Sequence, residues 1–119
     1  MPAAERTMIL LKPEAFRRLL VDRIIDTFVN AGFVVKAART VVKPQRSLVE
    51  EHYCPEEFAA LHKLEIRKRV VSYCCSGTVM AVLLERTDAI ARAEAMRDII
   101  HGPRNAEEAG RQIRLWFKM

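Results

Sequence analysis

The amino-acid sequence predicts one α/β (α+β) domain: a ferredoxin-like split β-α-β sandwich, in which a four-stranded antiparallel sheet carries helices on its faces. Two observations predict it. Four short apolar runs of strand length alternate with segments of helical periodicity, in the order β-α-β-α-β-α-β. The chain has 119 residues, 50% hydrophobic and 29% charged, which is typical of a folded domain and argues against disorder. We therefore expect residues 1–119 to form a single domain.

The first strand is predicted at residues 7–11, a continuous apolar run that ends at Lys12. Pro13 fits the first turn of a helix, where its missing N–H would have no partner. Apolar residues then recur at helical spacing as far as residue 28, and residues 30–32 supply a stop. Lys12 should therefore lie at the carboxyl end of a strand, beside a helix N-terminus, where phosphate is favoured.

The second and third strands are predicted from their composition. Residues 33–42 are rich in valine and alanine, and residues 78–84 are the most apolar run in the chain, which predicts a central strand buried on both faces. Three helical segments are expected between these strands, at residues 47–53, 55–58 and 64–75. Ser47 begins the first of them, with Glu50 three residues later in the spacing of a capping box.

The last third of the sequence predicts two more helices and an edge strand. We expect Asp88 to cap a helix that runs through Met96, and Asn105 to cap a final helix. Residues 113–117 are predicted to form an edge strand with a basic residue inserted. His101 falls between these helices, in a Gly-Pro turn.

The net charge indicates the kind of partner, and the cysteine content indicates the cellular compartment. The net charge is +5, from 20 Lys and Arg against 15 Asp and Glu, and the pI is about 9.4, which suits anionic partners such as nucleotides or nucleic acid. Residues 1–6 have no apolar segment of the kind a leader contains, and no apolar run is long enough to cross a membrane, so we expect an untargeted protein. The odd cysteine count, from Cys54, Cys74 and Cys75, is typical of reduced thiols, and we expect a cytoplasmic protein.

His101 is a candidate nucleophile. An unperturbed imidazole has a pKa of about 6.5, so a large fraction is neutral and able to attack at physiological pH. A surface histidine in a turn is the competing interpretation, and on this turn alone it is the simpler one.

Motifs along most of the chain resemble those of the nucleoside diphosphate kinase family. The matching segments, in family order, are residues 5–14, 51–53, 76–77, 99–102 and 113–117. The most specific of them are the His-Gly turn at His101 and the Leu-Trp-Phe ending at residues 115–117.

This resemblance implies a ping-pong reaction on nucleoside di- and triphosphates, with Mg²⁺ held through the phosphates and no metal ligand from the protein. His101 would accept the γ-phosphoryl group and pass it to a second nucleoside diphosphate. Lys12 and Tyr53 match family residues at the phosphate and the histidine, and Arg92 is the best match for a phosphate-binding arginine. Gln112 stands where the family has a glutamate that orients the imidazole. The resemblance also implies a homo-oligomer.

Several positions depart from the family pattern. The family carries a long segment, the Kpn loop, before the histidine, and most of it is missing here, so a phosphate arginine is lost unless Arg97 or Arg104 replaces it. Asp98 stands where the family has a ribose-binding asparagine, and Pro103 replaces a serine. The sequence is thus identified as a divergent member.

A further departure concerns the nucleotide base. The family has an Arg-Pro-Phe-Phe motif whose phenylalanine stacks on the base and whose arginine holds phosphate. Here the corresponding residues are 64–67, so Ile66 is the candidate to cover the base and Arg67 to reach a phosphate from a shifted position.

Three functions remain open from the sequence. The first is an active kinase with a reduced site, and it is the one we favour. The second is a catalytically inactive domain that serves as an oligomerisation or protein-interaction module. The third is a nucleic-acid binder, which the sequence supports least because aromatic and basic residues are not interleaved. Tyr53 could also be an ordinary helix residue at a rim, His52 and His62 are predicted to be solvated, and Trp116 to pack in a core or an interface.

Overall fold

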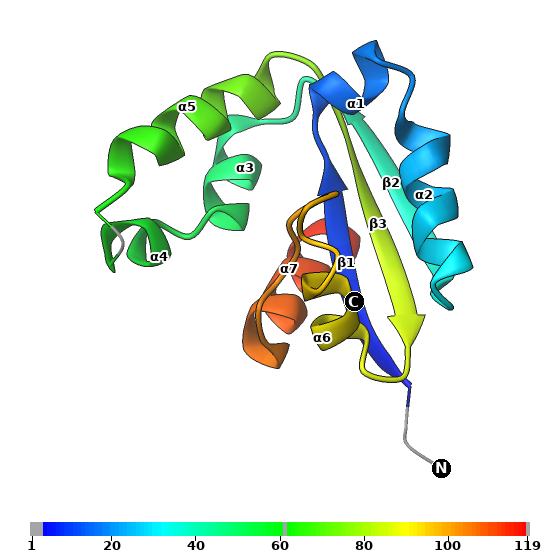
Figure 1. Cartoon of the computed structure of the whole chain (residues 1–119). Coiled ribbons are helices and arrows are strands. Elements are labelled where there is room, and N and C mark those ends of the chain that lie inside the picture. The colour runs from blue at the N-terminus through cyan, green and yellow to red at the C-terminus, as the bar shows by residue number, and fades with distance from the viewer. Residues whose placement is uncertain (1–3, 61, 119) are drawn as a thin grey trace.

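The computed structural model describes residues 4–60 and 62–118. Its centre is a three-stranded antiparallel sheet in the order β1-β3-β2, made of β1 (Glu5–Leu11), β2 (Val34–Val42) and β3 (Thr78–Arg86) (Figure 1). Val82 of β3 pairs with Ile9 on one side and with Ala38 on the other. The prediction that residues 78–84 form a central, buried strand is therefore confirmed.

Helices cover both faces of the sheet. They are α1 (Pro13–Arg17), α2 (Val21–Asn30), α3 (Arg46–His52), α4 (Pro55–Ala60), α5 (Leu64–Cys75), α6 (Ala89–Glu94) and α7 (Ala106–Phe117). Met8 and Leu10 of β1 pack with residues of α3, α5 and α7, whereas Ile9 and Leu11 pack with residues of α2 and α6. Successive strand residues point to opposite faces, so this alternation creates two apolar cores, one on each side of the sheet.

The fourth strand predicted at residues 113–117 is wrong, because these residues are the last turns of α7. The buried residues of α7 are Glu108, Ala109, Gln112, Ile113 and Trp116. Their spacing is that of one helical face, and this period prevails over a short apolar run. The predicted cap is confirmed: the Asn105 side chain accepts a hydrogen bond from the backbone N–H of Glu108 at 2.9 Å.

Three other local predictions also fail. The side chain of Asp88 makes no cap hydrogen bond, since this residue has φ of 56°, and the helix that follows it ends at Glu94 rather than at Met96. The single helix predicted from Pro13 to residue 28 is divided into α1 and α2, since Leu19 between them has φ of 55°, in the left-handed region that a right-handed helix cannot include. The capping box predicted at Ser47 does not form, because α3 starts one residue earlier, with Gln45 at its N-cap position and no side-chain cap.

The connections bring one end of β1 close to several distant segments. Helices α3, α4 and α5 form an arm beside the carboxyl end of β1, and the segment between α6 and α7 passes the same strand from the other side (Figure 1). A Cβ atom on Gly77 would meet the Pro13 Cβ at 2.9 Å, so this glycine lets the β3 entry pack directly against the start of α1. This packing fixes the chain on either side of Lys12.

None of the helices among the described residues is long and apolar enough to cross a membrane.

Candidate active site

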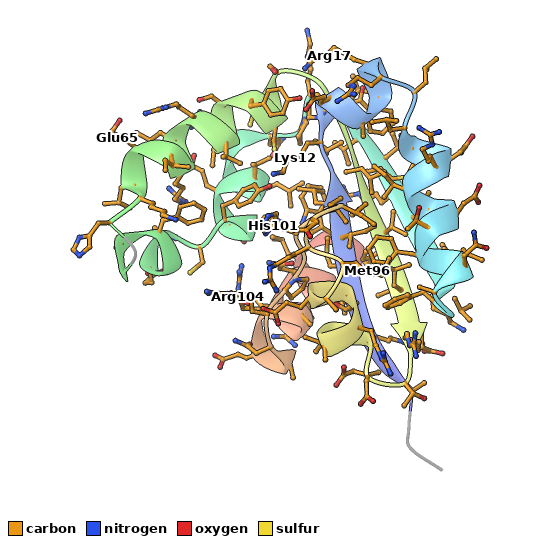
Figure 2. The ribbon with its side chains drawn as sticks, viewed as in Figure 1. Lys12, Arg17, Glu65, Met96, His101 and Arg104 are labelled. Carbon is orange, nitrogen blue, oxygen red and sulfur yellow. The ribbon has the colours of Figure 1, made fainter. Side chains whose placement is uncertain are left out.

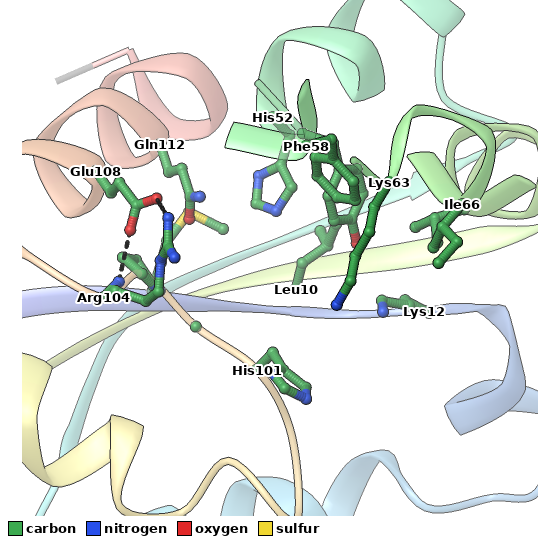
Figure 3. A pocket seen from close by; sticks show the side chains of 15 residues that line it. Leu10, Lys12, His52, Phe58, Lys63, Ile66, His101, Arg104, Glu108 and Gln112 are labelled. Atoms are coloured by element: carbon green, nitrogen blue, oxygen red, sulfur yellow. Dashed lines mark hydrogen bonds and ion pairs between the residues drawn. The ribbon is translucent and has the colours of Figure 1, made fainter. Parts of the chain in front are cut away.

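A cavity of about 470 Å³ lies between the arm, β1, α7 and the segment that precedes α7 (Figures 2 and 3). Its lining residues are Met8, Leu10, Lys12, His52, Tyr53, Phe58, Lys63, Ile66, Val70, His101, Gly102, Pro103, Arg104, Glu108 and Gln112. The cavity therefore gathers residues from five separate segments of the sequence, and these include most of the predicted catalytic positions.

His101 lies on the cavity wall, in the extended segment before α7 (Figure 3). Its side chain is exposed, and it also lines a second, smaller cavity of about 280 Å³ beside α1. A Cβ atom on Gly102 would stand 3.2 Å from the Met8 carbonyl oxygen, so the glycine allows this segment to run against β1. An accessible imidazole held against the sheet is suited to react with a ligand in the cavity.

Lys12 and Tyr53 meet on the opposite wall. The Lys12 Nζ is 5.8 Å from the centroid of the Tyr53 ring, which is a cation–π contact. Burial raises the pKa of Tyr53 well above its ordinary value, and the neighbouring Cys74 thiol, 4.0 Å from the hydroxyl, adds to the effect. Tyr53 is protonated and can donate a hydrogen bond, and its place in the cavity lining beside Lys12 favours the site interpretation over that of a helix residue at a rim.

Two further cations line the cavity: Arg104, which the sequence offered as a replacement for the missing phosphate arginine, and Lys63, which sequence reasoning did not identify. Lys63 comes from the connection between α4 and α5, and Arg104 from the segment before α7. Arg104 is anchored by Glu108, whose carboxylate accepts from the Arg104 backbone N–H at 2.7 Å and from Nη2 at 3.2 Å. The side chains of Lys12 and Lys63 form no ion pair with any side chain that the structure describes. Several cations facing one cavity favour a polyanionic ligand.

Four of the predicted nucleotide-binding residues lie outside the lining of this cavity. Arg92, Arg97 and Asp98 are exposed on and after α6. Arg67 donates to two backbone carbonyls, to Tyr53 at 2.5 Å and to Glu50 at 2.8 Å, so it braces the arm.

The histidine at position 52 is buried, and the prediction that it is solvated is wrong. Only 7% of His52 is exposed, because α3 packs on α7, where Trp116 is fully covered. The Trp116 indole Nε1 donates to His52 Nδ1 at 2.9 Å. Burial, followed by the charges of Arg111 and Lys12, lowers the pKa of His52 to about 3. His62, in contrast, is exposed as predicted.

The remaining wall of the cavity is apolar. Phe58, Ile66 and Val70 come from the arm, and Figure 3 shows Phe58 and Ile66 away from the Arg104 end. Ile66 was the predicted base cover, and Phe58 adds an aromatic ring that sequence reasoning did not identify as part of the site. In the sequence, Phe58 is marked only as an aromatic residue five positions after Tyr53. This spacing does not predict a site residue unless the fold is known.

The described residues contain no group of three His, Cys, Asp or Glu side chains that could hold a metal ion. The thiols of Cys54, Cys74 and Cys75 are free, in agreement with the prediction of reduced cysteines.

Comparison with solved structures identifies the class of protein. The chain superposes on a nucleoside-diphosphate kinase from Borrelia burgdorferi, a transition state mimic with bound vanadate and ADP, with a TM-score of 0.84 and 18% identity, over 96% of this chain and 87% of that one. An apo nucleoside diphosphate kinase from Encephalitozoon cuniculi gives a TM-score of 0.77 and 28% identity, over 94% of this chain and 88% of that one. The fold is that of the nucleoside diphosphate kinases.

Sequence comparison then shows the family. The family model for nucleoside diphosphate kinase matches residues 5–97. The cytosolic nucleoside diphosphate kinase of Dictyostelium discoideum is 33% identical over 138 aligned positions, which cover 96% of this chain and 84% of the relative. The chain belongs to the nucleoside diphosphate kinase family, as predicted. The aligned length exceeds the 119 residues of this chain, so the relative contains segments that are missing here.

Family membership also bears on the choice among the three functions that the sequence left open. The function supported by the fold, the family and the relatives is that of a nucleoside diphosphate kinase enzyme. No feature of the described residues favours the inactive module over it.

Proposed function

We propose that this chain moves the γ-phosphoryl group of a nucleoside triphosphate to a nucleoside diphosphate through phospho-His101. The observation that carries the proposal is the cavity that His101 lines together with Lys12, Tyr53, Lys63 and Arg104. A neutral ring nitrogen of His101 attacks the γ-phosphorus, an N–P bond forms, and the bond to the β-phosphate oxygen breaks, with that oxygen keeping the electron pair. The second half of the cycle is the reverse reaction, onto a different nucleoside diphosphate.

The other cavity residues support this chemistry by position and charge. In phosphoryl transfer the protein acts mainly by orienting the groups and neutralising the developing charge. Lys12, Lys63 and Arg104 supply positive charge, and Gln112, which is buried beside them, supplies an uncharged amide. We propose Arg104 as the replacement for the missing phosphate arginine, because Arg97 does not line the cavity.

The apolar end of the cavity suits the base. Phe58 offers a π-face for stacking, and Ile66 and Val70 have no polar group that could read a base edge. We therefore propose that the nucleotide enters with its phosphates toward His101 and its base toward α4 and α5, with little selectivity among bases. Arg67, Arg92, Arg97 and Asp98 could contribute only after movement of their segments.

Mg²⁺ fits this site as a partner of the nucleotide. Mg²⁺ is commonly bound through substrate phosphates with few protein ligands, and the described residues offer no cluster of acidic or imidazole ligands of their own. When bound, the ion would neutralise phosphate charge. Lys12, Lys63 and Arg104 would hold the same phosphates from the protein side.

The proposal is tested by incubating the purified protein with Mg²⁺ and γ-labelled ATP. We expect label that is stable in base, is lost in acid, and is chased quantitatively onto added GDP. Absence of label at saturating nucleotide would contradict the proposal.

We also propose that the chain assembles with copies of itself. β2 is at an open edge of the sheet, and 56% of Val34 and 71% of Val42 are exposed there. An edge strand with exposed apolar side chains is a ready surface for pairing with another chain. Sedimentation velocity should give a multiple of the 13.6 kDa chain mass, and dissociation on replacing Val34 with lysine would assign the contact to this edge. A monomer at tens of micromolar would contradict self-assembly.

A further inference from the structure

The tautomer of His52 is fixed by the one hydrogen bond that its side chain makes with a residue the structure describes. An indole N–H can donate but cannot accept, so the 2.9 Å contact from Trp116 Nε1 requires a lone pair on His52 Nδ1. The ring is uncharged, and its single proton must therefore be on Nε2. His52 cannot act as a phosphoryl acceptor in this state, because one ring nitrogen is engaged and the other is protonated.

The ring is held rigidly in this orientation. It makes edge-on contacts with the Tyr53 ring, at 4.7 Å between centroids, and with Trp116, at 5.7 Å. The Trp116 carbonyl accepts from Arg39 Nη1 at 2.8 Å, which ties α7 to β2. The His52 carbonyl accepts from Arg111 Nη2 at 3.3 Å. The carbonyl oxygen and the Nδ1 atom of His52 thus both accept hydrogen bonds from α7.

The Nε2–H group, in contrast, has no hydrogen-bond partner among the described residues. It forms no hydrogen bond with any atom that the structure describes, although His52 is 93% covered, and the residue lines the cavity that contains Lys12 and His101. Figure 3 shows its ring between Gln112 and Phe58, facing the cavity. The Nε2 atom is not among the fully covered side-chain atoms without a partner, so this donor is accessible from the cavity, where a ligand or water can accept its hydrogen bond.

We infer that His52 is a ligand-binding residue of this site, whose Nε2–H donates a hydrogen bond to a phosphoryl oxygen of the nucleotide bound in the cavity. The inference rests on the proposed function, because it assumes that the anion is a nucleotide phosphate. A phosphate oxygen is the expected acceptor, since the cavity wall next to His52 carries cations. A neutral, pre-oriented donor adds to their effect without requiring another charge to be buried.

Two substitutions separate this role from a structural one. In His52→Asn, the side-chain oxygen takes the place of Nδ1 and can still accept from Trp116, but the donor at the Nε2 position is lost. In His52→Gln, the amide N–H reaches approximately the Nε2 position, but the acceptor for Trp116 is lost. We therefore expect H52N to unfold at nearly the wild-type urea concentration and H52Q at a lower one.

The activities should follow the opposite order. We expect H52N to take up label from γ-labelled ATP at least about tenfold more slowly than wild type, the effect of losing one hydrogen bond to a charged group, whereas H52Q keeps most of the rate. A rate in H52N equal to that of wild type, or rates that follow the order of stability, would overturn the inference.

Two further readouts keep this result distinct from a failure of the proposed function. Long-range ¹H–¹⁵N correlation spectra should show the Nε2–H tautomer of His52, and the other tautomer would overturn the inference directly.

Calorimetric titration with Mg²⁺ and ADP measures nucleotide affinity without any phosphoryl transfer. In this titration H52N should bind ADP about tenfold more weakly than H52Q. If wild type binds ADP but takes no label, the proposed transfer fails and this comparison still decides the role of His52. If the wild-type protein binds no nucleotide, both the proposed phosphoryl transfer and the inferred role of His52 are overturned.

Discussion

Replacement of His101 with alanine is expected to abolish labelling by γ-labelled ATP, with a loss of at least about a thousandfold, because the nitrogen that accepts the phosphoryl group is removed. The other histidine that lines the cavity, His52, has its Nδ1 lone pair engaged by Trp116 and carries its proton on Nε2, so it cannot take over this role. The measurement is the initial rate of protein labelling with Mg²⁺ and excess ATP.

His62→Ala is the matched control for this experiment. His62 is also exposed, but it does not line the cavity, so its loss should leave the labelling rate within about twofold. Because His101 is exposed and makes no packing contact in either core, H101A should keep the wild-type free energy of unfolding within about 0.5 kcal/mol. Persistent label in folded H101A would show that His101 is not the acceptor.

The second large effect expected is acid destabilisation caused by His52. The pKa of His52 is about 3 in the folded protein, against about 6.5 in an unfolded chain. Between these two values the unfolded state binds a proton that the folded state excludes, so the free energy of unfolding falls as the pH falls. At pH values more than about one unit above 6.5 both states are neutral, and His52 then contributes no pH dependence.

The size of this effect follows from linkage. One excluded proton is worth up to about 1.4 kcal/mol for each pH unit, so His52 should account for a loss of about 2 to 3 kcal/mol between pH 7 and pH 4.5. Burial is the main cause, and the positive charges of Arg111 and Lys12 act in the same direction. Tyr53 and Trp116 face the ring with aromatic surfaces and stay uncharged over this range.

Urea denaturation of wild type and H52N at several pH values measures this contribution. Asparagine does not titrate, so H52N should become more stable than wild type by about 2 to 3 kcal/mol, relative to their difference at pH 7, when both are compared at pH 4.5. Glu108, which lines the same cavity, is present in both proteins, so its contribution is common to the two curves. Parallel curves for the two proteins would show that His52 does not exclude a proton on folding.

The sequence alone determined the elements whose signals are local. The apolar run at residues 78–84 predicted a buried strand, and Asn105 followed by a helical period predicted a capped helix. The family motifs placed His101, Lys12 and Tyr53 in one site because each is tied to a recognisable neighbour, the Gly-Pro turn, the strand end and the helix end. The structure contains the strand and the cap, and the three side chains line one cavity, while their catalytic roles stay predictions.

Only the tertiary structure decided the features that depend on contacts between distant segments. Residues 113–117 have strand-like composition, yet the packing of Ile113 and Trp116 on β1 and β3 makes them helical. Arg67, Arg92 and Lys63 are equally basic in the sequence, and only the path of the arm and of α6 brings Lys63 to the cavity and leaves the arginines outside it.

The burial of His52 also depends on contacts between distant segments, and for this reason the sequence did not predict it. In the sequence it is a histidine on an amphipathic helix, with no local sign of burial. Its depth, its tautomer and its lowered pKa all come from Trp116, Arg111 and Lys12, which are 40 to 64 residues away along the chain. Local periodicity specifies which elements form, whereas desolvation and charge depend on which elements pack together, and therefore the chemistry of this site is decided by the fold.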